Sequence, residues 1–367
     1  QSLLFVLIAN FILEIKGMYF AYWLALFSTA AFANMLGLNI SASFNSAVTI
    51  YIIIPLLMIP MMILSGAMFS FDKMNRSVSR LDKVPLIAEF MVTKWTYEAL
   101  MVHQFKDNEF TRQFYDFDKI ESQSDFKMVY WLPEMRDRLN KVRSELNEKQ
   151  KIVDEAQTLQ LLYNEISKEI QIPESVRFSA LFGLKKEIEK TRRIRRQRVY
   201  PNEFNELDRL NSDSFDNEVA GKIETYLDHR EKFYSRSFAA IVQLKDNLIN
   251  LHLEKHPESY KNYFDWYYNE GIADIVKKVY ESNKILEYRN KLIQHYDPVY
   301  LDPVVEGKLD FRSHFFSPSK QFLGKHFDTY FFNISVVWIL TLILYVVLYY
   351  DLLKKLIGIS ETLKRRR

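Results

Sequence analysis

The 367-residue sequence contains no cysteine and only nine glycines, and both shortages exclude classes of chemistry. Without cysteine the chain has no disulfide framework, no thiolate nucleophile and no Cys-based zinc site. None of the glycines belongs to a G-x-x-x-x-G-K-[ST] phosphate loop, so the chain carries no ATPase motif of its own. No Ser/His/Asp order or paired-carboxylate motif stands out from chance, and we expect no catalytic site.

Charged side chains are nearly absent from residues 1–71, although the average composition resembles that of a soluble protein. Mean hydropathy is −0.17 and the formal net charge is +3. The charged side chains that precede Asp72 are Glu14 and Lys16, whereas residues 72–326 are densely charged. Because a membrane-spanning helix needs ~20 mostly apolar residues, the apolar windows predict an integral membrane protein with a large aqueous domain.

Residues 1–71 are expected to hold three transmembrane helices, the first of them partial. The expected spans are 2–15, 18–38 and 46–71, with an uncharged polar break at 39–45. The first span lies in an apolar run without a preceding basic region, so we expect the chain to be the later part of a longer polypeptide. The second span carries small residues at every fourth position, which favours close helix packing: Ala33, Gly37 and Ser41.

The third span contains Pro55 and Pro60. Each proline removes an intrahelical hydrogen bond and predicts a kink. In a membrane such a break is tolerated beside protein or a water-filled cavity, so this helix is a candidate pathway helix; ordinary structural use of the prolines is the alternative.

A short amphipathic segment follows within residues 72–105. Its apolar residues Trp95, Ala99 and Val102 recur at helical spacing, and Glu98 lies among them. The helix is too short and too charged to cross a bilayer. We therefore expect a re-entrant segment.

Residues 326–351 form the last expected span, and a basic tail occupies 352–367. Because short basic loops stay on the cytoplasmic side, we expect a cytoplasmic C-terminus and place 72–326 outside the membrane, in the periplasm of a bacterial inner-membrane protein. The fold class is therefore mainly α.

The external domain, 106–325, is expected to be α-helical and partly coiled-coil-like. Apolar residues follow a helical period over 139–163, 215–251 and 272–293. Three prolines between 297 and 319 indicate an irregular return to the membrane rather than a core sheet. Long helices outside a membrane would form a stalk or a docking surface.

Three features of this domain have both a structural and a functional interpretation. A basic run is either a solvated face or a contact for anionic lipid or an acidic partner; its arginines are Arg192, Arg193, Arg195 and Arg196. His252 and His256 lie one helical turn apart but lack the His-Glu-x-x-His order of a zinc protease, so we expect no metal site. The aromatic cluster at 262–271 would either bind a ligand or pack between helices. Nucleic acid is not an expected partner.

The order of these segments resembles the C-terminal half of the permease of ATP-binding-cassette exporters of the G-subfamily type, the type-2 exporter fold. Two stretches carry the resemblance. ANMLGLNISASFNSAVTIYIIIPLLMIPMMILSGAMF (33–69) is similar to the family's fourth and fifth spans, and WTYEALMVHQF (95–105) is similar to its aromatic-x-x-Glu-Ala-Leu segment. The domain of about two hundred residues before the last span is much larger than the family's usual loop.

The resemblance implies a role for particular residues. The translocation path would be lined by Pro55, Ile59, Met62, Ala67 and Met68. A re-entrant cap over it would include Trp95, Tyr97 and Glu98.

The resemblance also implies partners: membrane lipid, a second permease half, a periplasmic protein, and an ATP-binding cassette that holds ATP and Mg. The contrasting hypothesis is a membrane-anchored scaffold or sensor whose spans only hold the helical domain.

Overall fold

The computed structural model describes residues 1–44, 46–75, 80–149, 152–171, 203–255, 257–304, 307 and 310–357, and these form two compact units. The first, called the membrane unit below, combines Gln1–Arg112, Lys261–Lys277 and Leu301–Arg367. The second, the helical unit, combines Gln113–Tyr260 and Lys278–Tyr300. The expected external domain, 106–325, is thus divided, because 261–277 and 301–325 pack with the apolar helices.

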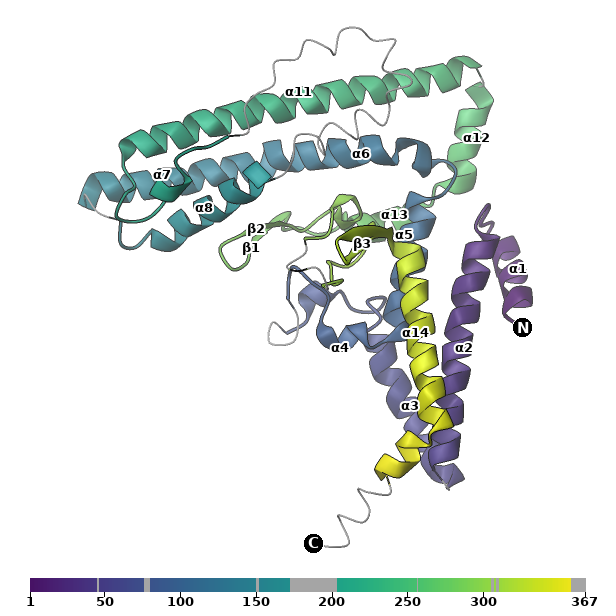
Figure 1. The fold of residues 1–367 in the computed structure, drawn as a ribbon. Helices are drawn as coiled ribbons and strands as arrows, with labels where there is room; N and C mark the ends of the chain where they lie inside the picture. The colour runs from purple at the N-terminus through teal and green to yellow at the C-terminus, as the bar shows by residue number, and fades with distance from the viewer. Residues whose placement is uncertain are drawn as a thin grey trace, which may run out of the picture. The chain divides into compact units, whose positions relative to one another are not determined.

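Two of the described helices are long and apolar enough to cross a membrane: α2 (Tyr19–Ser43) and α14 (Thr329–Tyr349). Helices α1 (Ser2–Ile12) and α3 (Ala47–Ile63) are apolar but shorter. The helix α14 packs along α2, as Figure 1 shows. Helix α3 remains α-helical through Pro55 and Pro60 and ends eight residues before the expected end of the third span.

The polar break expected at 39–45 is wrong over most of its length, because α2 continues to Ser43. The side chain of Asn39 is buried and donates hydrogen bonds to the carbonyl of Met35, at 2.8 Å, and to that of Leu344 on α14, at 3.0 Å. A satisfied amide does not need to leave the helix. Asn39 therefore joins two apolar helices instead of ending one.

The charged segment that follows the third apolar helix folds into short elements. These are the 3₁₀ turn η1 (Phe71–Lys73), α4 (Leu86–Glu89) and α5 (Val92–Lys106). Helix α5 packs against α2, α3, α4, α13 and α14, so it lies inside the membrane unit. The predicted amphipathic helix is present over the expected residues.

The chain returns to the membrane unit in two places. Helix α12 (Pro257–Tyr267) leads into α13 (Glu270–Lys277), and the hairpin of β3 (Ser319–Phe322) and β4 (Lys325–Asp328) leads into α14. Residues Leu323 and Gly324 both have positive φ, which is the requirement of a two-residue type I′ turn. The irregular return expected at 297–319 thus ends in an antiparallel hairpin.

The described residues of the helical unit include four long helices: α6 (Thr111–Phe126), α7 (Leu132–Lys149), α8 (Ala156–Gln171) and α11 (Asn217–Lys255). A π-helical turn, η2 (Lys127–Trp131), joins α6 to α7. Pro133, which has no amide hydrogen, follows directly and disturbs the regular α-helical bonding there. The single helix expected over 139–163 is wrong, because α7 and α8 form a hairpin; the pattern over 215–251 is one helix, as expected.

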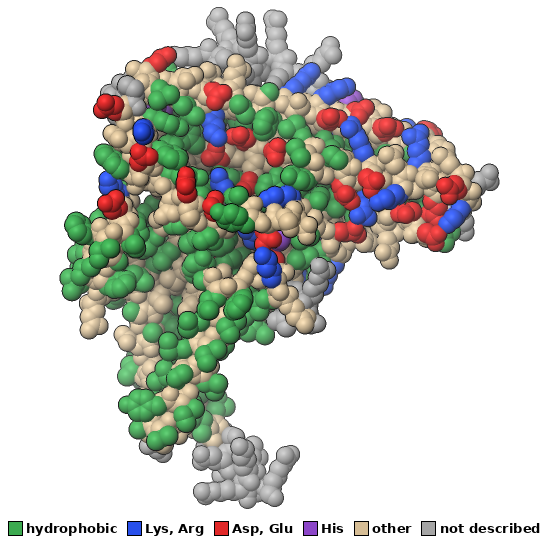
Figure 2. Space-filling model, turned by 180° about the vertical axis from the view of Figure 1, so that it is seen from behind, with side chains coloured by type: hydrophobic (Ala, Val, Ile, Leu, Met, Phe, Trp, Pro, Cys, Tyr) green, Lys and Arg blue, Asp and Glu red, His purple; other side chains and the backbone are tan. Residues whose placement is uncertain are grey.

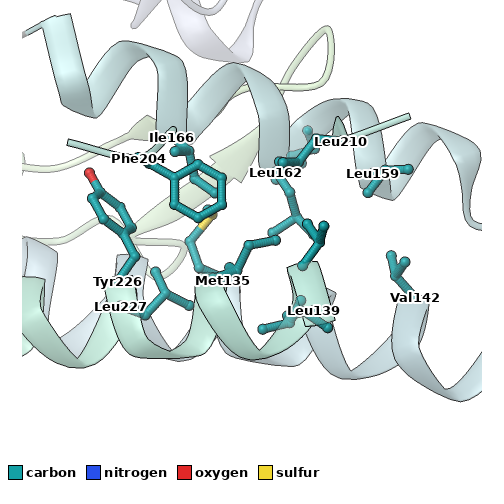
Figure 3. Packing of buried hydrophobic residues seen from close by; sticks show 14 of the residues in the cluster. Met135, Leu139, Val142, Leu159, Leu162, Ile166, Phe204, Leu210, Tyr226 and Leu227 are labelled. Atoms are coloured by element: carbon teal, nitrogen blue, oxygen red, sulfur yellow. The ribbon is translucent and has the colours of Figure 1, made fainter. Parts of the chain in front are cut away.

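The core of the helical unit lies where α7, α8 and α11 meet. Figure 3 shows side chains of all three helices pointing into it, joined by Phe204 and Leu210 from the segment before α11. This segment contains the short turn η4 (Leu207–Arg209). The unit therefore has a hydrophobic core of its own, as expected of an independent helical domain.

The helix expected over 272–293 is wrong beyond Lys277. Strands β1 (Ile285–Glu287) and β2 (Leu292–Gln294) follow instead, and the turn η5 (Pro298–Tyr300) closes the unit. Arg289 and Asn290 both have positive φ, so this hairpin also has a type I′ turn. Two three-residue strands are too short to show an alternating pattern.

The two units differ in surface chemistry. Figure 2 shows the bundle of apolar helices covered by hydrophobic side chains, whereas acidic and basic side chains intersperse over the helical unit. On α14, Phe331, Leu342 and Tyr349 are each more than half exposed. Exposed apolar helices of this kind are typical of a surface that faces lipid.

Candidate functional site

The candidate site is the buried face of α5. Trp95, Ala99, Val102 and Phe105, the residues of the amphipathic pattern, are all buried, and so is Glu98. A carboxylate enclosed among apolar side chains is costly unless it is paired and hydrogen-bonded. The contacts of Glu98 therefore define the site.

Glu98 is paired with a lysine from the hairpin before the last helix. Lys320 Nζ on β3 lies 2.7 Å from Glu98 Oε1 and 2.7 Å from Ser313 Oγ. The exposed fraction of both charged side chains is at most 1%. This pair joins α5 to the chain segment that leads into α14.

A second ammonium group lies on α5 itself. Lys94 Nζ is 3.3 Å from the second oxygen of Glu98 and 2.9 Å from an oxygen of Glu89 at the end of α4. It also lies 3.5 Å from the centroid of the Trp95 ring, a favourable cation–π position. Trp95 Nε1 donates to the carbonyl of Glu89 at 2.7 Å. These contacts hold α4 and α5 together.

Helix α14 contributes Asn333. Its amide donates to Glu98 Oε2 and to the carbonyl of Trp95, each at 3.1 Å, and the side chain is fully buried. Each oxygen of Glu98 thus accepts from a different element. We call Glu89, Lys94, Glu98, Lys320 and Asn333 the charge cluster.

The formal charges of the cluster cancel, because two carboxylates face two ammonium groups. Removing ions from water costs several kcal/mol each, about as much as good pairing returns. The cluster is therefore a weak source of net stability, but removing one partner would leave an unpaired buried charge. Its physical effect is to fix the relative positions of α4, α5, β3 and α14.

The segment before β3, residues 310–317, adds further contacts with the residues just before α4. Lys83 Nζ lies 2.5 Å from Asp310, and the amide of Val84 donates to the carbonyl of Ser313 at 3.1 Å. Burial raises the pKa of Asp310, but the hydrogen bond and charge of Lys83 lower the pKa more, so it lies below its usual value. The carboxylate is therefore ionised at neutral pH.

Aromatic packing completes this side of the hairpin. Phe315 packs on Phe71, with ring centroids 4.9 Å apart, and on Tyr97 at 6.2 Å. Gly66 lies beneath the same ring with φ of +81°, and a Cβ there would come within 2.5 Å of Phe315. Glycine is therefore required at position 66, just after α3, because a side chain there would overlap the Phe315 ring. Tyr97, an expected cap residue, is half-buried in this aromatic contact.

Helix α3 is attached to α5 by a hydrogen bond from Thr93 Oγ1 to the carbonyl of Met61, at 2.5 Å. Just beyond the end of α3, Ser65 Oγ donates to the carbonyl of Met62 at 2.7 Å, a bond within the same segment. The residues expected to line a path are exposed within this chain: Pro55, Ile59, Met62, Ala67 and Met68. They lie on or just after α3 and do not contact the charge cluster in any hydrogen bond that the described residues make.

The residues expected to mediate helix packing do not contact the chain's other helices closely. Ala33 and Ser41 are exposed on α2, and a Cβ added at Gly37 would have no atom within 4 Å. Their face of α2 is therefore open in the single chain. Arg192, Arg193, Arg195 and Arg196 lie outside the described residues, and so does His256.

Four members of the charge cluster were not anticipated from the sequence: Glu89, Lys94, Lys320 and Asn333. Lys320 lies in a stretch that reads as an irregular loop, and Asn333 is a lone amide in an apolar span. A polar residue inside a spanning helix is expensive and marks a partner, so Asn333 carried a usable signal. Lys320 carried none, because an isolated lysine in a polar loop is ordinary.

Comparison with known proteins gives one family match. Residues 1–105 match the family model described as ABC-2 type transporter. No curated protein and no solved structure matches the chain. The match ends at Phe105, one residue before the end of α5, and it includes Glu89, Lys94 and Glu98 of the charge cluster. It covers less than half of the chain. Together with the two apolar helices α2 and α14, it indicates an integral membrane protein and supports a type-2 ABC transporter permease.

Proposed function

We propose that the chain is the transmembrane subunit of an ATP-driven exporter. The observation that supports it best is the ABC-2 match over residues 1–105, which includes the short helices α4 and α5 with their buried charges. In this proposal α4 and α5 form the re-entrant segment. A non-spanning helix with buried ions is tolerated at membrane depth only where protein or water surrounds it. A cap over a translocation path meets that condition.

In this proposal α3 lines half of the path. Pro55, Ile59, Met62, Ala67 and Met68 are exposed on one chain, which suits residues that face a cavity or a second permease half. Trp95, Tyr97 and Glu98 belong to the cap that closes the path externally. A second permease half, identical or related, would complete the enclosure.

Energy would come from an ATP-binding cassette that holds ATP and Mg, on the same polypeptide or another. The helical unit would lie outside the membrane, with the C-terminus in the cytoplasm of a bacterial inner-membrane protein. Its separate core supports a docking role for a periplasmic partner or cargo. The proposal includes that the exporter is of the G-subfamily type.

The test is co-purification. The full chain, tagged and expressed in its own host, is solubilised in mild detergent, and bound proteins are assayed for ATPase activity that vanadate inhibits. We expect an ATP-binding cassette, and a Glu98→Gln variant should retain it but show reduced ATP-driven turnover. Recovery of the chain without any ATPase would favour the scaffold or sensor hypothesis instead.

A matched control uses the Lys106–Asp328 pair, which also links α5 to the start of α14. Lys106 Nζ lies 2.6 Å from Asp328 Oδ2, but the two side chains are 22% and 29% exposed. Lys106→Gln should leave turnover within about twofold of the original, because exposed pairs contribute little. An equal loss in both variants would assign the Glu98 effect to general damage.

A further inference from the structure

A second polar site lies in the membrane unit, away from the charge cluster. A cavity of about 190 Å³ lies between the α1–α2 turn, the C-terminal part of α12 and the end of α5. The turn supplies Glu14 and Lys16, α12 supplies Asp265 and Trp266, and α5 supplies Gln104. The cavity is smaller than the ~300–1,000 Å³ of typical drug-sized sites, so it suits a small polar group.

The walls of this cavity are ordered by specific contacts. Lys16 Nζ lies 4.0 Å from the centroid of the Trp266 ring. Gly17, with φ of +74°, brings the turn so close to α12 that an added Cβ would be 3.4 Å from Tyr267. The floor is held by hydrogen bonds of Gln104 with Tyr22 and of Asn108 with the carbonyl of Gln104.

The surroundings of the cavity are apolar. Phe11, Ile12 and Leu13, at the end of α1, are 80%, 69% and 66% exposed, and Leu13 also lines the cavity. Trp266 is half exposed beside them. Tryptophan, tyrosine and lysine at the end of apolar helices are typical of the membrane–water interface. A ligand that fits both parts must be amphipathic, with a polar group in the cavity and an acyl chain along α1.

We propose that this cavity binds the headgroup of a zwitterionic glycerophospholipid that carries a primary ammonium group. The phosphate would lie toward Lys16, and the ammonium would lie toward Glu14, Asp265 and the aromatic rings. The cavity lining carries two carboxylates, those of Glu14 and Asp265, and one ammonium group, that of Lys16. This balance disfavours an anionic headgroup, because the two carboxylates would repel a ligand with a net negative charge. This inference does not depend on transport or on an ATPase.

The experiment measures lipid binding to the purified, delipidated full chain by native mass spectrometry. Phosphatidylethanolamine and phosphatidylglycerol with identical acyl chains are offered in equal amounts. We expect phosphatidylethanolamine to be retained preferentially. Glu14→Gln with Asp265→Asn should lower that preference by about 1.4- to fivefold per lost charge, the range of an exposed ion pair. Lys16→Gln should weaken binding of both lipids.

The control variant is Glu270→Gln, an exposed carboxylate on α13 that does not line the cavity; it should keep the original preference. Free glycerophosphoethanolamine tests the source of the headgroup and should compete weakly. The proposal is overturned by equal retention of the two lipids, by an unchanged preference in the double variant, or by competition from the free headgroup as strong as from the lipid. Because all four substituted side chains are exposed, each variant is expected to fold.

Discussion

Lys320 Nζ donates a hydrogen bond of 2.7 Å to Glu98 Oε1, although the two residues lie 222 positions apart. Glu98 lies on α5, inside the part that matches the ABC-2 family, and Lys320 lies on β3, beyond the helical unit in sequence. The segment that returns from the helical unit is therefore built into the core of the membrane unit. Helices α4 and α5 and the chain that leads into the final helix form one buried structure.

The first prediction concerns this pair. Glu98→Gln or Lys320→Met should each lower the free energy of unfolding by about 3–5 kcal/mol, because each leaves a buried charge without its partner. The double variant should recover part of the loss. The measurement is the midpoint of thermal aggregation of the full chain in detergent.

Lys106→Gln serves as the comparison, since its pair is partly exposed and should contribute about 0–1 kcal/mol. If Glu98→Gln and Lys106→Gln shift the midpoint equally, the charge cluster has no special structural role. Full recovery in the double variant would show that the pair adds no net stability, as buried pairs often do not.

The second prediction concerns two glycines with opposite surroundings. Gly66→Ala should destabilise the membrane unit, because φ is +81° and the new Cβ would overlap the Phe315 ring. Gly37→Ala on α2 should be neutral or stabilising by up to ~1 kcal/mol, since alanine is the better helix former and the site is open. Thermal unfolding of both variants gives the comparison.

The Gly37→Ala variant also tests whether a further helix packs closely on Ala33, Gly37 and Ser41, as expected. If a second permease half packs there, the methyl group should weaken dimers measured by cross-linking in membranes while leaving the isolated chain stable. Stable dimers in this variant would place the contact elsewhere. Increased stability of Gly66→Ala would contradict the steric interpretation.

Much of the fold is readable from local periodicity. The apolar helices are readable from the length of their apolar runs, and α5 and α11 from a helical repeat whose buried residues agree with it. The burial of Glu98 was also predictable, since it falls between Trp95 and Val102 on one face. The agreement arises because burial on one face is a local property of the sequence.

The rest depends on distant partners. Asn39 reads as a break, but a carbonyl on α14, 305 positions away, satisfies its amide and keeps the helix intact. Lys320 likewise acquires its partner from a residue far along the chain. No local pattern contains that information, so Glu98 is the only member of the charge cluster that the sequence predicted.

The third prediction concerns pH and the helical unit. Glu145 on α7 accepts hydrogen bonds from the amides of Asp154, Glu155 and Val153, at 2.8, 2.9 and 3.2 Å, just before α8 begins. The amide of Asp154 is the largest cause that lowers the pKa of Glu145, to about 2, against the opposing effect of burial. An unfolded glutamate has a pKa of about 4.3.

The folded pKa is the lower one, so the contribution of Glu145 is fully present above pH ~4.3 and is lost as pH falls toward 2. Hydrogen exchange of a peptide that covers 152–159 should therefore accelerate over this window beyond the intrinsic rate. Glu145→Gln should raise exchange at pH 6 and remove the added acceleration. A variant with the same pH profile as the original would exclude Glu145 as the group responsible.

The fourth prediction uses the absence of cysteine, because a single introduced cysteine can be labelled without background. Asp137→Cys lies on α7, where the side chain is 56% exposed, and Lys354→Cys lies after α14 in the exposed start of the tail. If the basic tail is cytoplasmic, as the positive-inside rule predicts, a membrane-impermeant maleimide should label Asp137→Cys in cells with a permeabilised outer membrane. Lys354→Cys should react only after the inner membrane is opened. Reversed labelling would invert the proposed orientation, and labelling of both positions from outside would show that α14 does not separate them across the membrane.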